Sequence, residues 1–187
     1  SAGYIQAYPP GVRENGGQYT HGGVWALMAQ ARLESEGHAP PSDLPYRWFT
    51  WLSPAHRAAD PQHGPVYGLE PYAVAGDVYS APPHVGRGGW SWYTGAASWL
   101  HRAAVESVFG LTMDATTLSM RPALPAHWPR AEMTLLRGER LLQFVVLQGA
   151  GEAAEALDAV PLHPGESVAW TTLPLHTRFV MRLPARS

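Results

Sequence analysis

The chain has 187 residues, of which 45% are hydrophobic and 15% are charged, a composition typical of a globular protein with a sizeable core. Its 13 basic and 15 acidic residues give a formal net charge of −2, so we expect no nucleic-acid partner. The absence of cysteine excludes disulfides, thiolate metal sites and cysteine nucleophiles. No apolar run approaches the roughly 20 residues that cross a bilayer, so we expect a soluble region.

The first residues carry neither an initiator Met nor a signal peptide. Ser1 leads almost directly into the loop that begins at Tyr8-Pro9-Pro10. We therefore expect the chain to be part of a longer polypeptide.

Four segments of the first 112 residues have helical features. The first begins near Thr20 and runs to about Glu34, with apolar residues at three- and four-residue spacing and a stop signal at Gly37. The others extend from Leu44 to Leu52, from Pro71 to Tyr79, and from Thr94 to a point before Gly110.

After residue 112 the pattern changes to short apolar and β-branched runs between Gly, Pro and His turns, which predicts a small antiparallel β region. We expect one domain at 1–112 and a β-rich region at 113–187, in an α+β fold. Glu152–Leu157 is the exception, because this run is also compatible with a helix. The expected strands are Met133–Leu136, Leu141–Leu147, Ser167–Leu173 and Thr177–Leu183.

The loop from Arg13 to His21 concentrates polar side chains just before a predicted helix. It combines a cation, a carboxylate, two amides, a phenol and an imidazole, and two glycines let the backbone approach a ligand closely. The alternative is a polar loop in which Thr20 caps the helix. Capping does not explain the other polar residues, so we expect a loop that contacts a ligand through side chains including Arg13, Glu14, Gln18, Tyr19 and His21.

A second motif, from Pro82 to Gly95, is rich in Gly and aromatic residues and precedes the last predicted helix. Free backbone N–H groups and the positive end of the helix dipole favour an anion at such a terminus, where Thr94 adds a hydroxyl and Gly95 allows close approach. Trp92 belongs to a set of flat rings suited to stacking on sugars. Ordinary capping, with Trp90 and Trp92 in the core, is the alternative.

Two carboxylates, Glu70 and Asp77, lie two turns apart on the predicted helix that begins at Pro71 and would share one face. An acid–base pair is conceivable there, but an acid at a helix start is also common. The nine histidines show no metal-ligand spacing, so we expect no metal site and no bound cofactor.

At these motifs the sequence resembles the glycoside hydrolase family 94 phosphorylases. The run Tyr8–His21 is similar to a signature loop of that family, and Glu70-Pro71-Tyr72 and Asp77–Gly95 resemble it further on. The Pro82–Trp90 form resembles that of cyclic β-1,2-glucan synthases. The resemblance implies the last helices of an (α/α)6 barrel followed by a small β region, of which Pro122–Pro129 is the entry.

The resemblance also implies inverting phosphorolysis, with inorganic phosphate as co-substrate and a β-glucan oligosaccharide as the second partner. His21, Thr94 and Gly95 match phosphate-binding positions, and Glu14 matches a sugar-contacting carboxylate. No segment matches the family's general acid, an Asp on an upstream loop, so we expect no catalytic acid in this chain. We therefore expect the isolated chain to be inactive. The residues that follow Glu70-Pro71-Tyr72, from Ala73 to Gly76, differ from the pattern of cellobiose phosphorylases.

Three functions remain open at this point. The leading one is a phosphorylase domain of a cyclic β-1,2-glucan synthase, an inner-membrane protein with this domain in the cytoplasm. The second is a cytoplasmic β-1,2-oligoglucan or cellobiose-type phosphorylase. The third is a non-catalytic sugar-binding remnant. The rest of the parent polypeptide is an expected partner, and a homodimer is a further possibility.

Overall fold

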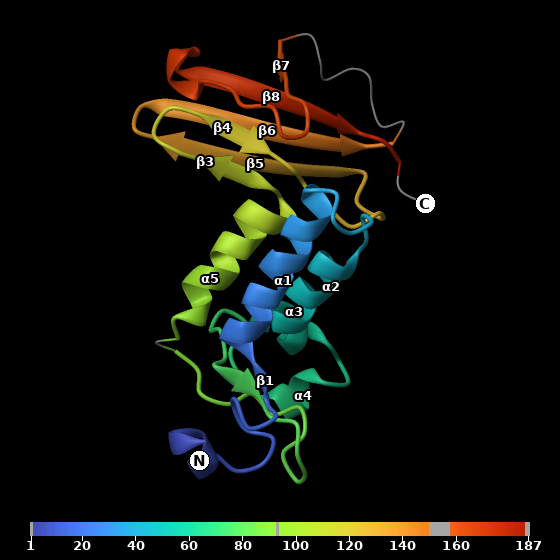
Figure 1. The fold of residues 1–187 in the computed structure, drawn as a ribbon, viewed down its shortest axis with the longest axis vertical. Helices are drawn as coiled ribbons and strands as arrows, with labels where there is room; N and C mark the ends of the chain where they lie inside the picture. The colour runs from blue at the N-terminus through green and yellow to red at the C-terminus, as the bar shows by residue number, and fades with distance from the viewer. Residues whose placement is uncertain (1, 93, 150–157, 186–187) are drawn as a thin grey trace. The chain divides into compact units, whose positions relative to one another are not determined.

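The computed structural model describes residues 2–92, 94–149 and 158–185 (Figure 1). The chain divides into two compact units, one of residues 1–40 and 44–104, the other of residues 41–43 and 105–187. The helices α1 to α5 lie in the first unit and the four-stranded sheet lies in the second. The mixture of helices and small sheets expected from the sequence is thus confirmed.

Helix α1, Thr20–Ser35, is the central element of the first unit and matches the predicted segment closely. Tyr19, rather than Thr20, occupies the N-cap position, and no side chain caps this end. Gly37 ends the helix with a φ of 78°, a left-handed conformation that glycine adopts without steric cost. The face that α1 buries follows three- and four-residue spacing and consists of Thr20, Val24, Leu27 and Ala31.

The remaining helices of this unit are α2 (Leu44–Leu52), α3 (Pro54–Ala59), α4 (Gly64–Tyr67) and α5 (Ala96–Arg102). A 3₁₀ turn covers Gly3–Ala7, and a π-helical turn, Ala103–Val108, continues α5. Both α2 and α5 pack against α1 (Figure 1). Helix α2 matches its prediction exactly in extent, whereas α3 and α4 were not predicted because each is too short to show a helical period.

The predicted helix from Pro71 to Tyr79 is wrong. This segment forms turns and then strand β2, Asp77–Val78, which pairs antiparallel with β1, Gln18–Tyr19. Strand pairing to a partner about 60 residues away fixes this backbone, and local periodicity carries no information about such a partner. Glu70 and Asp77 therefore do not share a helix face.

The second unit contains two sheets. Strands β3 (Leu111–Met113) and β4 (Leu118–Met120) form an antiparallel pair. The larger sheet has the order β5-β6-β8-β7, made of Arg130–Arg137, Arg140–Gln148, His176–Leu183 and Val160–Pro161. Its β5–β6 hairpin is antiparallel as expected, but β8 runs parallel to both β6 and β7, so the sheet as a whole is mixed.

The core of the larger sheet is centred on β6, whose residues from 144 to 148 are all buried. A strand that is covered on both faces carries a nearly continuous apolar run instead of an alternation. Phe144 and Phe179 pair across β6 and β8, and their rings stack with centroids 5.0 Å apart.

One predicted strand, Ser167–Leu173, is wrong. Val168 makes only an isolated bridge to Leu118, and Trp170–Thr172 forms a 3₁₀ turn. The Trp170 indole N–H donates to the Asp114 carbonyl at 3.3 Å, a contact that fixes the turn. The segment Glu152–Leu157, for which a helix was the alternative, lies outside the described residues.

Candidate functional site

The loop that precedes α1 is held in place by a buried carboxylate. Asp77 is 1% exposed, and its Oδ2 accepts a hydrogen bond of 2.6 Å from the backbone N–H of Arg13. Arg13 has a φ of 46°, an uncommon conformation for a residue with a side chain. Ser80 adds a second tie by donating its hydroxyl to the Gly16 carbonyl at 2.6 Å. Asp77 of β2 and Ser80, just after it, thus hold the loop from residue 11 to 17.

The starts of α1 and α5 are joined through residues 74–76. The backbone N–H of Thr20, the first residue of α1, donates to the Gly76 carbonyl at 3.0 Å. The hydroxyl of Thr94, just before α5, donates to the Val74 carbonyl at 3.0 Å. Two helix N-termini, neither with an acidic residue in its first turn, are therefore fixed by one short segment. Such termini favour negatively charged groups.

His21 lies in the first turn of α1 within a group of aromatic rings. Its ring centroid is 4.7 Å from that of Trp25, 5.9 Å from that of Trp99 and 6.3 Å from that of Tyr19. The guanidinium carbon of Arg102 lies 4.8 Å from the Trp99 ring centroid, which adds a positive charge to the group. His21 Nε2 is buried and has no hydrogen-bond partner among the described residues.

Gly95, the N-cap of α5, is exposed, and a Cβ atom built on it would meet no heavy atom within 4 Å. The Thr94 side chain is partly buried, and its hydroxyl proton is directed at Val74. The structure thus places the three residues matched to phosphate binding, His21, Thr94 and Gly95, at the two helix starts that residues 74–76 join.

Trp92 is half exposed and also has a positive φ, 63°. Its indole N–H donates to Glu70 Oε1 over 3.4 Å, and its ring meets the ring of Tyr72 edge to face with centroids 5.9 Å apart. The other carboxylate oxygen, Glu70 Oε2, is buried without a hydrogen-bond partner in the described part of the chain. An exposed aromatic pair beside a carboxylate is suited to contact with a sugar.

The other polar residues of the loop differ in their exposure and in their side-chain contacts. Glu14 is exposed, and the Arg13 guanidinium carbon lies 5.9 Å from the Tyr8 ring centroid. Gln18 uses both ends of its amide, donating to the Trp51 carbonyl at 3.1 Å and accepting from Arg57 at 2.6 Å. Burial lowers the pKa of Arg57 from its usual value. Gln18 thus links the loop to α2 and α3.

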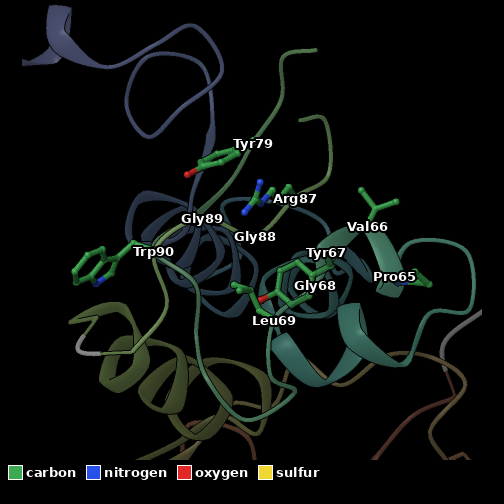
Figure 2. Close-up of a pocket in the computed structure, with 10 residues that line it drawn as sticks. All are labelled: Pro65, Val66, Tyr67, Gly68, Leu69, Tyr79, Arg87, Gly88, Gly89 and Trp90. Atoms are coloured by element: carbon green, nitrogen blue, oxygen red, sulfur yellow. The ribbon is translucent and has the colours of Figure 1, made fainter. Parts of the chain in front are cut away.

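A cavity of about 490 Å³ opens on the same unit (Figure 2). We call it the Arg87 cavity. Figure 2 shows the Arg87 guanidinium beside the Tyr79 ring and the backbone of Gly88 and Gly89. Burial raises the pKa of the Tyr67 hydroxyl on the opposite wall. The cavity is lined by residues 65–69, Tyr79 and residues 87–90.

Comparison with known proteins identifies the origin of this arrangement. Residues 1–110 match the profile of the "Glycosyl hydrolase 94 superfamily, catalytic domain", which covers more than half of the chain. The chain belongs to glycoside hydrolase family 94. Both loops described above, and both helix starts, lie within the matched range.

Three curated relatives of this family 94 chain differ in similarity. It is 47% identical over 127 residues to the cyclic beta-(1,2)-glucan synthase NdvB of Rhizobium meliloti. These aligned residues make up 68% of this chain and 4% of the synthase. It is 28% identical over 145 residues to solabiose phosphorylase of Paenibacillus borealis, an alignment that covers 76% of this chain and 18% of that enzyme. It is 26% identical over 139 residues to N,N'-diacetylchitobiose phosphorylase of Vibrio proteolyticus, an alignment that covers 71% of this chain and 16% of that enzyme. The chain therefore spans less than a fifth of each relative.

Two kinds of feature are absent from the described residues. No helix among them has the length and apolar character that crossing a membrane requires. No group of three or more His, Asp or Glu side chains among them is arranged to hold a metal ion.

Sequence reasoning missed three features of this family 94 site. Asp77 was considered as one of an acid–base pair or as an acid at a helix start, whereas it anchors Arg13. Its position beside apolar Ala75 and Val78 was the available signal of a buried residue. The bond from Trp92 to Glu70 and the link from Arg57 to Gln18 join residues 22 and 39 positions apart. No local pattern indicates such contacts.

Proposed function

We propose that this chain forms the phosphate-binding side of a glycoside phosphorylase that cleaves β-glucosidic linkages, with β-1,2-glucan as substrate, within a cyclic β-1,2-glucan synthase. The greater identity to a glucan synthase than to the disaccharide phosphorylases supports this choice over the alternatives. In the parent, helices α1 to α5 form the last part of an (α/α)6 barrel. The general acid is an Asp that the rest of the parent supplies.

The proposed reaction proceeds with inversion. A phosphate oxygen forms a bond to the anomeric carbon as the bond from that carbon to the glycosidic oxygen breaks, and the general acid donates its proton to the departing oxygen. The products are glucose 1-phosphate and a glucan shortened by one unit. Phosphate is already ionised and acts as a nucleophile, so this chain needs to position it and balance its charge, without providing a base.

One observation carries the assignment of the phosphate side, namely the orphaned Nε2 of His21 at the start of α1. A buried polar atom without a partner costs about 1–3 kcal/mol, so a ligand that pairs with it recovers this energy. Phosphate fits because the helix terminus and the Arg102 charge both favour an anion. The exposed ring of Trp25 meets the His21 ring edge to face beside this position.

Thr94 and Gly95 complete the phosphate side in this proposal. Gly95 offers backbone without a side chain in an open position at the start of α5. The Thr94 hydroxyl turns from the Val74 carbonyl to donate to a phosphate oxygen, a rotation about one bond. In this proposal His21 and Thr94 act on one ligand, and the hydrogen bonds of residues 74–76 to both helix starts support it.

The sugar side is formed by the two loops. Glu14, which is exposed, accepts hydrogen bonds from sugar hydroxyls, and Arg13 and Tyr19 of the same loop add further polar groups. Trp92 provides an aromatic face for the sugar ring. Gln18 contributes by holding the loop against Arg57 and the Trp51 carbonyl.

The test is release of glucose 1-phosphate from linear β-1,2-glucan by the full-length parent. We expect release that requires inorganic phosphate and falls at least 100-fold in His21→Ala and Thr94→Ala. His38→Ala is the matched control, because His38 is a mainly exposed histidine of the same unit paired with Glu36. Glucan cleavage that does not depend on phosphate, or full activity of both variants, would refute the proposal.

A further inference from the structure

We propose that the Arg87 cavity is an additional subsite that binds one glucosyl unit of a β-glucan chain. This inference rests on the proposed function, because that function makes the glucan the ligand. The cavity volume of about 490 Å³ lies within the range of roughly 300–1,000 Å³ that small-molecule sites occupy. Nothing in the assignment of the phosphate side involves this cavity.

The cavity presents both kinds of group that a sugar ring requires. The Arg87 side chain makes no hydrogen bond or ion pair with any described residue, so its five N–H donors are available to hydroxyl oxygens. The ring of Tyr79, which lies beside the Arg87 guanidinium, provides apolar surface for the C–H face of a sugar (Figure 2). Such alternation of donors and rings favours a polyol over a purely apolar ligand.

The charge behind the cavity wall favours a neutral ligand over an anion. A Cβ atom on Gly89 would overlap Oδ1 of Asp77, which means that the carboxylate lies directly behind this glycine. That oxygen is buried and has no hydrogen-bond partner among the described residues. An anion drawn to Arg87 would therefore also meet the negative charge of Asp77, whereas a neutral sugar would not.

Backbone hydrogen bonds connect the cavity to the start of α1. The Trp90 carbonyl accepts from the Gly76 N–H at 2.6 Å, and the Gly76 carbonyl accepts from the Thr20 N–H at 3.0 Å. Thr20 directly precedes His21, the central residue of the proposed phosphate side. Two backbone hydrogen bonds thus connect the cavity wall to the residue that precedes His21, and in this proposal one glucan chain of several units occupies both sites.

The inference predicts that affinity depends on glucan length through Arg87. The experiment is calorimetric binding of linear β-1,2-glucans to the full-length parent without phosphate, comparing wild type with Arg87→Ala and Tyr79→Ala. We expect both variants to lose about tenfold in affinity for long glucans and less than twofold for the shortest glucan that binds. Arg47→Ala is the matched control, since Arg47 is an exposed arginine of α2 that lies over the Trp51 ring.

Two results would overturn the subsite. One is unchanged affinity for long glucans in both variants. The other is weaker binding of inorganic phosphate in Arg87→Ala with glucan binding intact, which would make the cavity an anion site. Because binding is measured without phosphate, a parent that binds long glucan through Arg87 but releases no glucose 1-phosphate would support the subsite and refute the proposed reaction.

Discussion

Replacing Asp77 with Ala tests how the site loop is held. Asp77 Oδ2 is the acceptor for the backbone N–H of Arg13, at 2.6 Å and in a buried position. A hydrogen bond to a charged group contributes about 1.5–3 kcal/mol, and the variant also releases the left-handed conformation of Arg13. The loop should therefore open more often, while the helices, which Asp77 does not cap, stay folded.

Amide hydrogen exchange measures this opening directly. The Gly17 N–H donates to the Arg13 carbonyl at 2.9 Å and reports on the loop. Since about 1.4 kcal/mol corresponds to a factor of ten, the Asp77→Ala variant should exchange this amide roughly 10- to 100-fold faster. Asp114→Ala is the control, because Asp114 also accepts backbone N–H groups but belongs to the other unit. Exchange within twofold of wild type in Asp77→Ala would refute the reasoning.

Three further predictions concern titration, the phosphate side and the core. Hydrogen bonds from the Thr116 and Thr117 backbone lower the pKa of Asp114 to about 2. The contribution of the Asp114 carboxylate to folding stability should therefore be complete above about pH 4 and disappear as the pH falls through about 2. A carboxyl NMR titration of Asp114 with a midpoint near 4 would contradict this prediction. Gly95→Ala should leave the melting temperature of the parent unchanged but weaken phosphate binding, because its Cβ meets only open space in the protein; equal phosphate affinity would count against close approach there. Phe144→Ala should lower the free energy of unfolding, measured with denaturant, by about 3–5 kcal/mol. Leu136→Ala is the control and should lower it by less than about 0.5 kcal/mol, because Leu136 is 73% exposed. Similar losses in the two variants would contradict the assignment of the core.

The elements that sequence patterns predicted well are those whose own residues determine them. Helices α1 and α2 have a regular apolar face, and six of the nine residues of β6 are apolar, four of them consecutive from Phe144 to Leu147. Strand β2 was missed because two residues carry no period, and its pairing with β1 depends on a distant segment. The parallel pairing of β8 with β6 was missed for the same reason, since an apolar run does not specify the direction of its partner.

The candidate site divides in the same way. The motifs around His21 and Thr94 were identifiable because polar residues and glycines gather there ahead of helices. The residues that hold these motifs were not identifiable, because Asp77 meets Arg13 across 64 positions. The structural role of Asp77 depends on its three-dimensional contacts, and the residue type alone is equally compatible with acid–base chemistry.

In the proposed function, phosphate binds between the starts of α1 and α5. The most direct test is an experimental structure of the full-length parent with inorganic phosphate and a β-1,2-glucan oligosaccharide. We predict a phosphate whose oxygens lie about 2.7–3.2 Å from His21 Nε2 and within hydrogen-bonding distance of Thr94 Oγ1. A phosphate bound elsewhere, with His21 Nε2 still buried and without a partner, would contradict this proposal.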